Sequence, residues 1–207
     1  MTLELPLGKT LGIIGGTGSG KSTLVSLIPR LYDAGTGSVS VMGADVRTWP
    51  LDQLRHVVAT VPQRASLVSG TIRSNLNWRD EAATDDELWA ALDMAQASEF
   101  VHNKPQGLDA PVEAGGKNFS GGQRQRLTIA RAGGFASDID HGRFRLGARL
   151  KTDAALRRAI RERSMRGAAA GGLPLTTVIV SQRVSTVRDA DMICVLDHGS
   201  VAGWHAR

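Results

Sequence analysis

The sequence lacks several features that define whole classes of protein. It has a single cysteine, Cys194, inside the apolar run MICVL, so we expect a buried thiol, no disulfide framework and a cytosolic setting. No apolar run approaches the ~18 residues of a membrane-spanning helix, and Met1 leads into LELPLGKTLGIIGG without the charged segment of a signal peptide. What remains is the composition of a soluble globular domain of 207 residues, 42% hydrophobic and 22% charged.

Aromatic residues are also scarce in the most basic part of the chain. The formal net charge is +5, and Lys and Arg residues are dense between Arg143 and Arg166. A nucleic-acid-binding surface usually interleaves such a run with several aromatic side chains, whereas this run contains only Phe144. We therefore keep a nucleic-acid-associated protein only as an alternative and expect no nucleic-acid partner.

A glycine-rich segment near the start of the chain carries the strongest signal. Leu11 to Thr23, LGIIGGTGSGKST, fits G-x-x-x-x-G-K-[ST] between a short apolar strand and a helix predicted over residues 23–32. The glycines let successive backbone N–H groups surround a phosphate, and the helix presents its positive end to that phosphate. Lys21 is expected at the β- and γ-phosphates, and the Ser22 hydroxyl at Mg²⁺.

Two further segments predict ordinary secondary structure. The run HVVATV at 56–61 predicts a strand, and Val61-Pro62-Gln63 follows it. Thr84 and Glu87 have the spacing of a capping box, and apolar residues then recur at i, i+3, i+4 and i+7, so an amphipathic helix begins there. Trp89 on this helix is expected to pack rather than to bind a ligand.

A second glycine-containing motif follows, NFSGGQRQRLTIARA at residues 118–132. Ser120 suits an N-cap, and the glycines after it leave the first N–H groups of a helix open to an anion. The residues from Gln123 onward favour a helix.

In this order and spacing, GGTGSGKST, VPQ and NFSGGQRQRLTIARA resemble the nucleotide-binding domain of an ABC transporter, and LVSGTIRSNL resembles ABC exporters in particular. The resemblance implies an α/β fold, a P-loop NTPase core over residues 1–70 and 119–207 with a helical subdomain over about 71–118. It further implies ATP and Mg²⁺ as cofactors, a second nucleotide-binding domain and a transmembrane domain as partners, and a place at the cytoplasmic face of the cell membrane. The strands that the family places upstream of Leu3 are not in the sequence, so we expect a piece of a longer exporter.

By the same resemblance, site roles fall on numbered residues of this chain. Gln63 would contact Mg²⁺ and the attacking water, and Ser22 would be the other metal ligand. The signature would contact ATP bound to the second domain, so that two domains enclose two ATP molecules. The nucleotide-binding residues would be Gly15, Gly16, Thr17, Gly18, Ser19, Gly20, Lys21, Ser22 and Thr23, with Ser120, Gly121, Gly122 and Gln123 acting in trans.

Residues 133–150, GGFASDIDHGRFRLGARL, lack what the family places after the signature helix. The resemblance implies an apolar strand ending in Asp, the Walker B motif, then a catalytic Glu and an S-A-L-D turn, which together hold Mg²⁺ and polarise water. Asp138, Asp140 and His141 are better interpreted as a polar loop than as a metal cluster.

A change of reading frame is our hypothesis for this stretch. Codons compatible with Phe135 to Leu150 can be chosen so that reading one base later gives LRPILIMDDSVSALD, which contains the apolar strand, the Asp and the turn. Resequencing the DNA of codons 130–155 tests it. An unchanged sequence would mean that the Walker B strand is absent, and ATP hydrolysis would then not be expected.

The C-terminal part predicts a buried strand at Thr176 to Gln182, a short helix, and a β-hairpin turning at Asp197-His198-Gly199, with His198 and His205 exposed. The family usually has a switch His where this chain has Gln182. Together with Asp in place of Glu in the restored frame, Gln182 resembles the weakly hydrolysing half of a heterodimeric exporter.

Three functions therefore stay open. The first is the ATPase domain of an ABC exporter, which couples ATP binding and hydrolysis to export. The second is a catalytically dead remnant without Walker B, whose lost strand would exceed the usual ~5–15 kcal/mol margin of stability. The third is a nucleic-acid-associated ABC ATPase.

Overall fold

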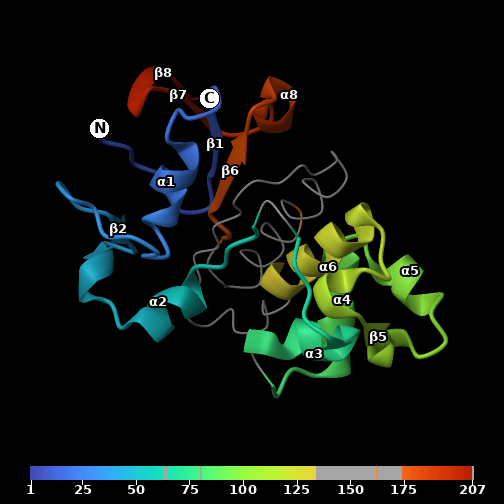
Figure 1. Cartoon of the computed structure of the whole chain (residues 1–207). Coiled ribbons are helices and arrows are strands. Elements are labelled where there is room, and N and C mark those ends of the chain that lie inside the picture. Colours follow the sequence, from blue (N-terminus) through green and yellow to red (C-terminus); the bar gives the residue numbers. More distant parts are fainter. Residues whose placement is uncertain (63–64, 80, 134–161, 163–173, 207) are drawn as a thin grey trace.

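The computed structural model describes residues 1–62, 65–79, 81–133, 162 and 174–206, and these residues form two lobes (Figure 1). One lobe contains a β-sheet with α1, α2 and α8, and the other contains α3, α4, α5 and α6. The two lobes have separate hydrophobic cores, one centred on the sheet and one on the helices. The predicted α/β fold is confirmed.

Strand β1 (Thr10–Ile14) is at the centre of the described sheet, which has the order β6-β1-β7-β8. Strands β6 (Thr177–Ser181) and β7 (Met192–Asp197) pair with β1 in parallel, and β8 (Ser200–Ala206) pairs with β7 in antiparallel fashion. The sequences TLGII and TVIVS are near-continuous apolar and β-branched runs, as expected for strands buried on both faces. The carboxyl ends of the three parallel strands therefore meet at one edge.

The C-terminal predictions agree with this sheet. Helix α8 (Val184–Val187) packs so closely on β1 that a Cβ at Gly12 would lie 2.5 Å from Cβ of Val187. The β7–β8 hairpin turns at Asp197-His198-Gly199, with His198 exposed. Cys194 is fully buried in the sheet core.

Helix α1 (Lys21–Ser26) is shorter than the helix predicted over residues 23–32. Pro29 has no amide hydrogen to donate and disfavours α conformation at Ile28, so the helix cannot continue through it. After the helix, Ile28 N donates to the carbonyl of Val25, three residues earlier, as in a 3-10 turn. Arg30 then takes a φ of 52°.

The strand predicted at residues 56–61 is wrong. Helix α2 (Leu51–Val57) covers the first two of those residues, and only Ala59 forms a β-bridge. Asp52 lies in the first turn of α2, and Arg55 and His56 lie in its last turn, which suits the helix dipole. The charged residues at both ends of α2 and the preceding Pro50 thus favour a helix, although the apolar run predicted a strand.

The helical lobe is built from short elements around one core that extends from Val61 to Ala130. Its longest described helices are α4 (Asp85–Met94) and α6 (Gly121–Gly133), which pack on each other. The predicted capping box of Thr84 and Glu87 is confirmed, and Trp89 packs against the core and stacks on the ring of His102 at 3.9 Å. The other elements of this lobe are β4 (Gly70–Thr71), α3 (Ile72–Leu76), η2 (Asn77–Arg79), α5 (Ser98–His102), η3 (Gly107–Asp109), β5 (Pro111–Val112) and η4 (Ala114–Gly116).

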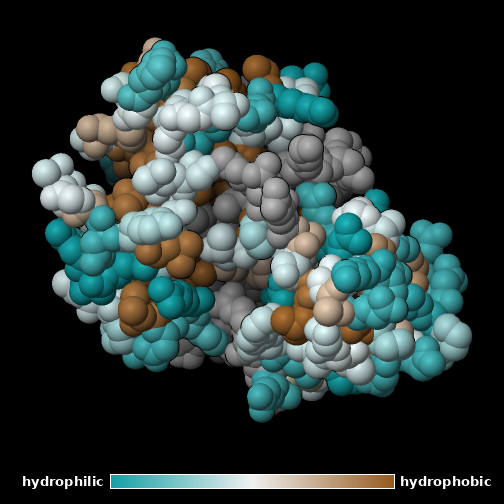
Figure 2. Space-filling view, viewed as in Figure 1, coloured by the Kyte–Doolittle hydropathy of each residue, from teal (hydrophilic) through white to brown (hydrophobic). Residues whose placement is uncertain are grey.

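The sheet lobe also carries a small hairpin and exposed apolar side chains. Strands β2 (Ser40–Val41) and β3 (Ala44–Asp45) pair with each other, and η1 (Val46–Thr48) follows. Figure 2 shows hydrophobic patches over this lobe. The exposed large apolar side chains of the lobe include Leu31, Tyr32 and Met42. Hydrophilic residues cover much of the helical lobe in the same view.

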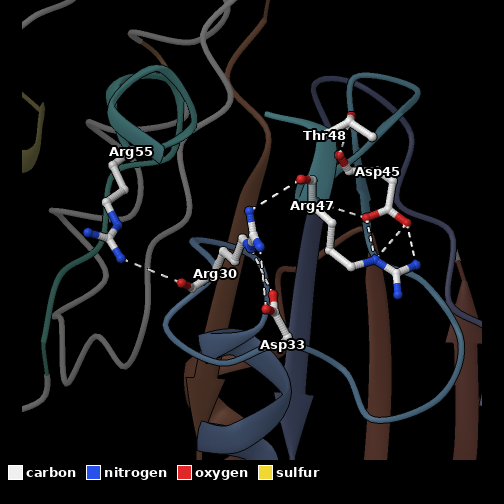
Figure 3. Close-up of polar contacts among 6 residues, drawn as sticks. All are labelled: Arg30, Asp33, Asp45, Arg47, Thr48 and Arg55. Atoms are coloured by element: carbon white, nitrogen blue, oxygen red, sulfur yellow. Dashed lines mark hydrogen bonds and ion pairs between the residues drawn. The ribbon is translucent and has the colours of Figure 1, made fainter. Parts of the chain in front are cut away.

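Arginine contacts join the loop after α1 to η1 and to α2 (Figure 3). Arg30 pairs with Asp33 at 2.7 Å and donates from Nη1 to the Arg47 carbonyl at 3.3 Å. Arg47 pairs with Asp45, with Nη2 2.6 Å from Oδ2, and Arg55 donates to the Arg30 carbonyl at 3.5 Å. These pairs are exposed, so we expect each to contribute little energy but to fix the geometry of three segments.

The Asp45–Arg47 pair predicts a pH dependence of stability. The side-chain and backbone hydrogen bonds from Arg47 lower the pKa of Asp45 to about 2. A lowered folded-state pKa stabilises the fold above the unfolded value of about 3.9, and this stabilisation is lost as the pH falls towards 2. In Asp45→Asn, the urea midpoint should therefore fall less between pH 5 and pH 2.5 than in the wild type. Glu4→Gln, which removes an exposed carboxylate that lies outside the helices and strands, is the matched control. An equal fall in Asp45→Asn and wild type would contradict the prediction.

Candidate nucleotide-binding site

The loop between β1 and α1 closes around the ammonium group of Lys21. Its Nζ donates to the carbonyls of Gly15 (2.9 Å) and Gly16 (2.5 Å) and to Oγ of Ser19 (2.9 Å). Lys21 and Ser19 are only 4% and 3% exposed, so the charge is held away from bulk water. A phosphate oxygen offers the same acceptor chemistry with a full negative charge, and such charge-assisted hydrogen bonds are stronger. The residues present thus fit a phosphate group at Lys21.

The backbone of this loop can only be built with glycine at its first position. Gly15 has a φ of 155°, and a Cβ there would lie 2.1 Å from the carbonyl oxygen of Leu196 at the end of β7. A Cβ on the next residue, Gly16, would meet no heavy atom within 4 Å. The loop is therefore closed on the side of β7 and open beside Gly16.

The turn after β7 and the end of β6 also contact the loop. Gly199, in the turn after β7, donates its N–H to the Ser19 carbonyl at 3.2 Å. Gln182, directly after β6, donates from Nε2 to Oγ1 of Thr17 at 3.2 Å. The structure thus brings the predicted switch position, Gln182, to the glycine-rich loop. The sequence pointed to Thr17 and Gln182 but not to their contact, and it predicted Gly199 as a turn residue but not as a neighbour of the loop.

The second glycine motif forms the start of α6. Ser120 Oγ accepts from Gln123 N at 3.2 Å, and Gln123 Oε1 accepts from Ser120 N at 2.9 Å, so the two residues form a capping box. The predicted N-cap at Ser120 is confirmed, although the helix begins at Gly121 rather than Gln123. Ser120, Gly121 and Gly122 are exposed.

An arginine fixes the chain that enters this motif. Arg124 Nη1 donates to the Phe119 carbonyl at 2.6 Å and to the Gly116 carbonyl at 3.3 Å. The two acceptors lie one and four residues before Ser120, so the exposed start of α6 has a defined position. No local pattern in the sequence predicts this contact.

The structure does not bring all predicted site residues together. The loop of Lys21 belongs to the sheet lobe, and Ser120 to Gln123 belong to the helical lobe (Figure 1). Ser22 is exposed at the start of α1. Gln63 lies outside the described residues, as do Asp138, Asp140, His141 and the rest of the anomalous stretch beyond Gly133. Within the described ranges, His, Cys, Asp and Glu form no cluster of three or more that could hold a metal.

Comparison with known proteins decides the family. A sequence model of the ABC transporter family matches residues 1–136. The chain belongs to the ABC transporter family. Within it, the chain is a nucleotide-binding domain, since its relatives are ABC transporter ATP-binding proteins.

An uncharacterized ABC transporter ATP-binding protein of Mycobacterium tuberculosis is 44% identical over 95% of this chain and 33% of its own length. One of Bacillus subtilis is 34% identical over 97% of this chain and 34% of its own length. ABC transporter B family member 21 of Arabidopsis thaliana is 37% identical, over 97% of this chain and 15% of its own length. The chain thus spans about a third or less of the length of these relatives.

A solved structure shows the same fold. The structure of a bacterial Atm1-family ABC exporter with ATP bound matches with a TM-score of 0.83 and 30% identity, over 99% of this chain and 34% of that one. The P-loop core predicted for this ABC domain is therefore confirmed. In the described part of the domain, no helix is both long and apolar enough to cross a bilayer.

Because the loop is closed at Gly15 and open at Gly16, alanine substitutions at these two positions should differ strongly in their effects. Gly15→Ala should destabilise the domain by about 2–4 kcal/mol, because the new Cβ meets the Leu196 carbonyl and φ is unfavourable. It should also weaken ATP binding at least tenfold. Gly16→Ala, whose Cβ meets open space, is the matched control and should change stability by less than ~0.5 kcal/mol. Urea denaturation and ATP titration measure both. Equal stability of the two variants would refute this account of the loop.

Proposed function

We propose that the chain binds ATP·Mg²⁺ through the loop from Gly15 to Thr23 and is the ATPase domain of an ABC exporter. The observation that carries the proposal is the ammonium group of Lys21, buried among the oxygens of Gly15, Gly16 and Ser19. Phosphate oxygens would replace some of these acceptors. Loop amides and the start of α1 would supply further hydrogen bonds to the phosphates.

Mg²⁺ would be held by few protein ligands. The Ser22 hydroxyl is exposed beside Lys21, and Gln63 is the second proposed ligand, assigned from the sequence. Mg²⁺ usually keeps several waters and binds through substrate phosphates, so one or two protein oxygens suit it. The bound ion would neutralise charge on the phosphates.

The proposed dimer follows from the separation of the two glycine motifs. Ser120 to Gln123 start α6 in the helical lobe, away from the loop of Lys21 in the same chain (Figure 1), and Ser120, Gly121 and Gly122 are exposed. A helix start with exposed glycines suits a phosphate. We therefore propose that it contacts ATP bound to a second nucleotide-binding domain, and that two domains enclose two ATP molecules head to tail.

Coupling to export is proposed from the same membership. A transmembrane domain would be the further partner, placing this domain at the cytoplasmic face of the membrane. The proposed helical subdomain, residues 71–118, would dock on that partner, and the P-loop core would comprise residues 1–70 and 119–207. Closure on ATP and opening after hydrolysis would drive transport.

Gln182 favours a second candidate, a domain that binds ATP but hydrolyses it slowly. Its amide reaches Thr17 of the loop at 3.2 Å, in the place where an imidazole would act. A side-chain amide does not titrate near neutral pH and cannot act as an acid or base there, whereas an imidazole can. Phosphate release slower than about one per minute from an ATP-bound chain supports this candidate, while turnover near the common enzymatic value of ~10 per second contradicts it.

Mixing two variants tests the proposed dimer. Lys21→Met removes the proposed phosphate contact, and Ser120→Arg blocks the proposed trans contact. Each variant alone should stay monomeric with ATP·Mg²⁺ in sedimentation velocity, while the wild type dimerises. An equal mixture should regain dimers, since one composite site then pairs an intact loop with an intact signature. Ser69→Arg adds an arginine at another exposed serine and should dimerise as the wild type does.

The same experiment separates the alternatives. If the wild-type chain neither binds ATP nor dimerises, the result supports the catalytically dead remnant. A mixture that stays monomeric, although the wild type dimerises, rules out the head-to-tail arrangement. Salt-sensitive DNA binding would instead support the nucleic-acid-associated ATPase.

A further inference from the structure

The turn between β7 and β8 reaches back to the glycine-rich loop. The hairpin pairs Asp197 with Ser200, and the two residues between them, His198 and Gly199, have φ values of 44° and 78°. Positive φ at both central residues is the geometry of the tight two-residue turns that join antiparallel strands. The N–H of Gly199 lies outside the strand ladder, and it donates to the Ser19 carbonyl at 3.2 Å. The turn therefore offers the loop a backbone donor that the hairpin itself does not use.

The same hairpin contacts the loop at both ends of its glycine motif. A Cβ at Gly15 would lie 2.1 Å from the Leu196 carbonyl oxygen, and a Cβ at Gly20 would lie 3.6 Å from Cα of Gly199. The bond from Gly199 to Ser19 falls beside the second of these contacts. The position of the loop relative to the sheet is therefore set at its start by Leu196 and at its end by the turn.

Ser19 connects the turn to the ammonium group of Lys21. Ser19 is 3% exposed, its carbonyl accepts from Gly199, and its Oγ accepts from Nζ of Lys21 at 2.9 Å. The other two acceptors of Nζ described above are backbone carbonyls, so Ser19 supplies a side-chain contact to the ammonium. Because a buried ammonium is costly unless it is hydrogen-bonded, a shift of Ser19 should also shift Lys21. Two hydrogen bonds thus lead from the β7–β8 turn to Lys21.

A second turn of the same geometry provides a comparison. The β2–β3 hairpin pairs Val41 with Ala44, and Met42 and Gly43 between them have φ values of 52° and 80°. A Cβ on Gly43, like one on Gly199, would meet no heavy atom within 4 Å. Both glycines are exposed, and both are required by the backbone conformation rather than by lack of space. The two turns differ because, within the described residues, only Gly199 donates its amide to another segment.

We propose that Gly199 is a positioning residue of the nucleotide site, which fixes Ser19 and thereby holds the ammonium of Lys21 where it selects a triphosphate over a monophosphate. Lys21 is expected at the β- and γ-phosphates, which AMP does not carry. A displaced ammonium therefore weakens the binding of ATP and leaves the binding of AMP nearly unchanged. The selection step rests on the proposed function, whereas the anchoring step depends only on the contacts among Gly199, Ser19 and Lys21.

Amide hydrogen exchange without nucleotide tests the anchoring step. In the wild type, residue-resolved NMR should show the Gly199 amide exchanging about fivefold more slowly than the Gly43 amide, after correction for intrinsic rates, because its hydrogen bond must open first. Gly199→Asn should keep this protection, since Asn tolerates positive φ. Gly199→Ala should lose most of it, since the turn then relaxes. Equal corrected rates for Gly199 and Gly43 in the wild type overturn the proposal.

Titration with ATP and with AMP, both in the presence of Mg²⁺, tests the selection step. The ratio of the Kd for AMP to the Kd for ATP should fall roughly three- to tenfold in Gly199→Ala, as expected for one displaced hydrogen bond. Gly199→Asn should restore most of the ratio. Gly43→Ala is the matched control, because it places the same side chain in a turn of the same geometry; it should leave the ratio unchanged. An unchanged ratio in Gly199→Ala, or an equal fall in Gly43→Ala, overturns the proposal.

Ser19→Ala tests the path between the turn and Lys21. The loss of Oγ should lower the same ratio at least as much as Gly199→Ala does. The double variant should lower it hardly further, because both changes act on Lys21 through one residue. Additive losses in the double variant would overturn the proposed path. A wild-type chain that does not bind ATP fails the proposed function instead, and the comparison of the Gly199 and Gly43 amides then still decides the anchor.

Discussion

Hydrogen bonding of β1 along both of its edges is the constraint on which the candidate site depends. Because β6 and β7 pair with β1 in parallel, their carboxyl ends arrive at the same edge as the glycine-rich loop. Ile14 lies opposite Ser181 and Val195, so Gln182 and Leu196 reach the loop as the next residues of their strands. A slip of one residue would reverse the faces of each strand and remove these contacts. The register of the sheet thus sets both the closed wall of the loop and the place of the switch position.

The helical lobe is stabilised by a shared hydrophobic core rather than by a sheet. Its elements are short, and helices of this length are marginal in water on their own, so a shared core must hold them, as the fully buried Ile72, Leu92 and Val101 show. Helix α6 belongs to that core, yet its start faces solvent at Ser120. A lobe with its own core can move as a unit relative to the sheet.

Local chemistry explains which parts were predictable. The spacing of Gly15, Gly20 and Lys21 and the capping box at Thr84 act within a few residues, so the pattern sufficed to predict the loop and the start of α4. The start of α6 at Ser120 was predictable for the same reason. The end of α1 before Pro29 also has a local cause, but the prediction followed the apolar pattern and extended the helix through the proline. Contacts such as Gln182 with Thr17 join residues far apart in the sequence and depend on strand register, which no local pattern encodes. The roles of Gln63 and of the stretch after Gly133 stay predictions, because both lie outside the described residues.

Amide hydrogen exchange with and without ATP·Mg²⁺ tests the central claim most directly, namely that this loop is the phosphate site. The account predicts slower exchange at the amides of residues 15–23 and at the adjoining turn of Gly199, with no such change in Lys21→Met. The claim would be contradicted if ATP·Mg²⁺ left exchange in the loop unchanged, or slowed it equally in Lys21→Met.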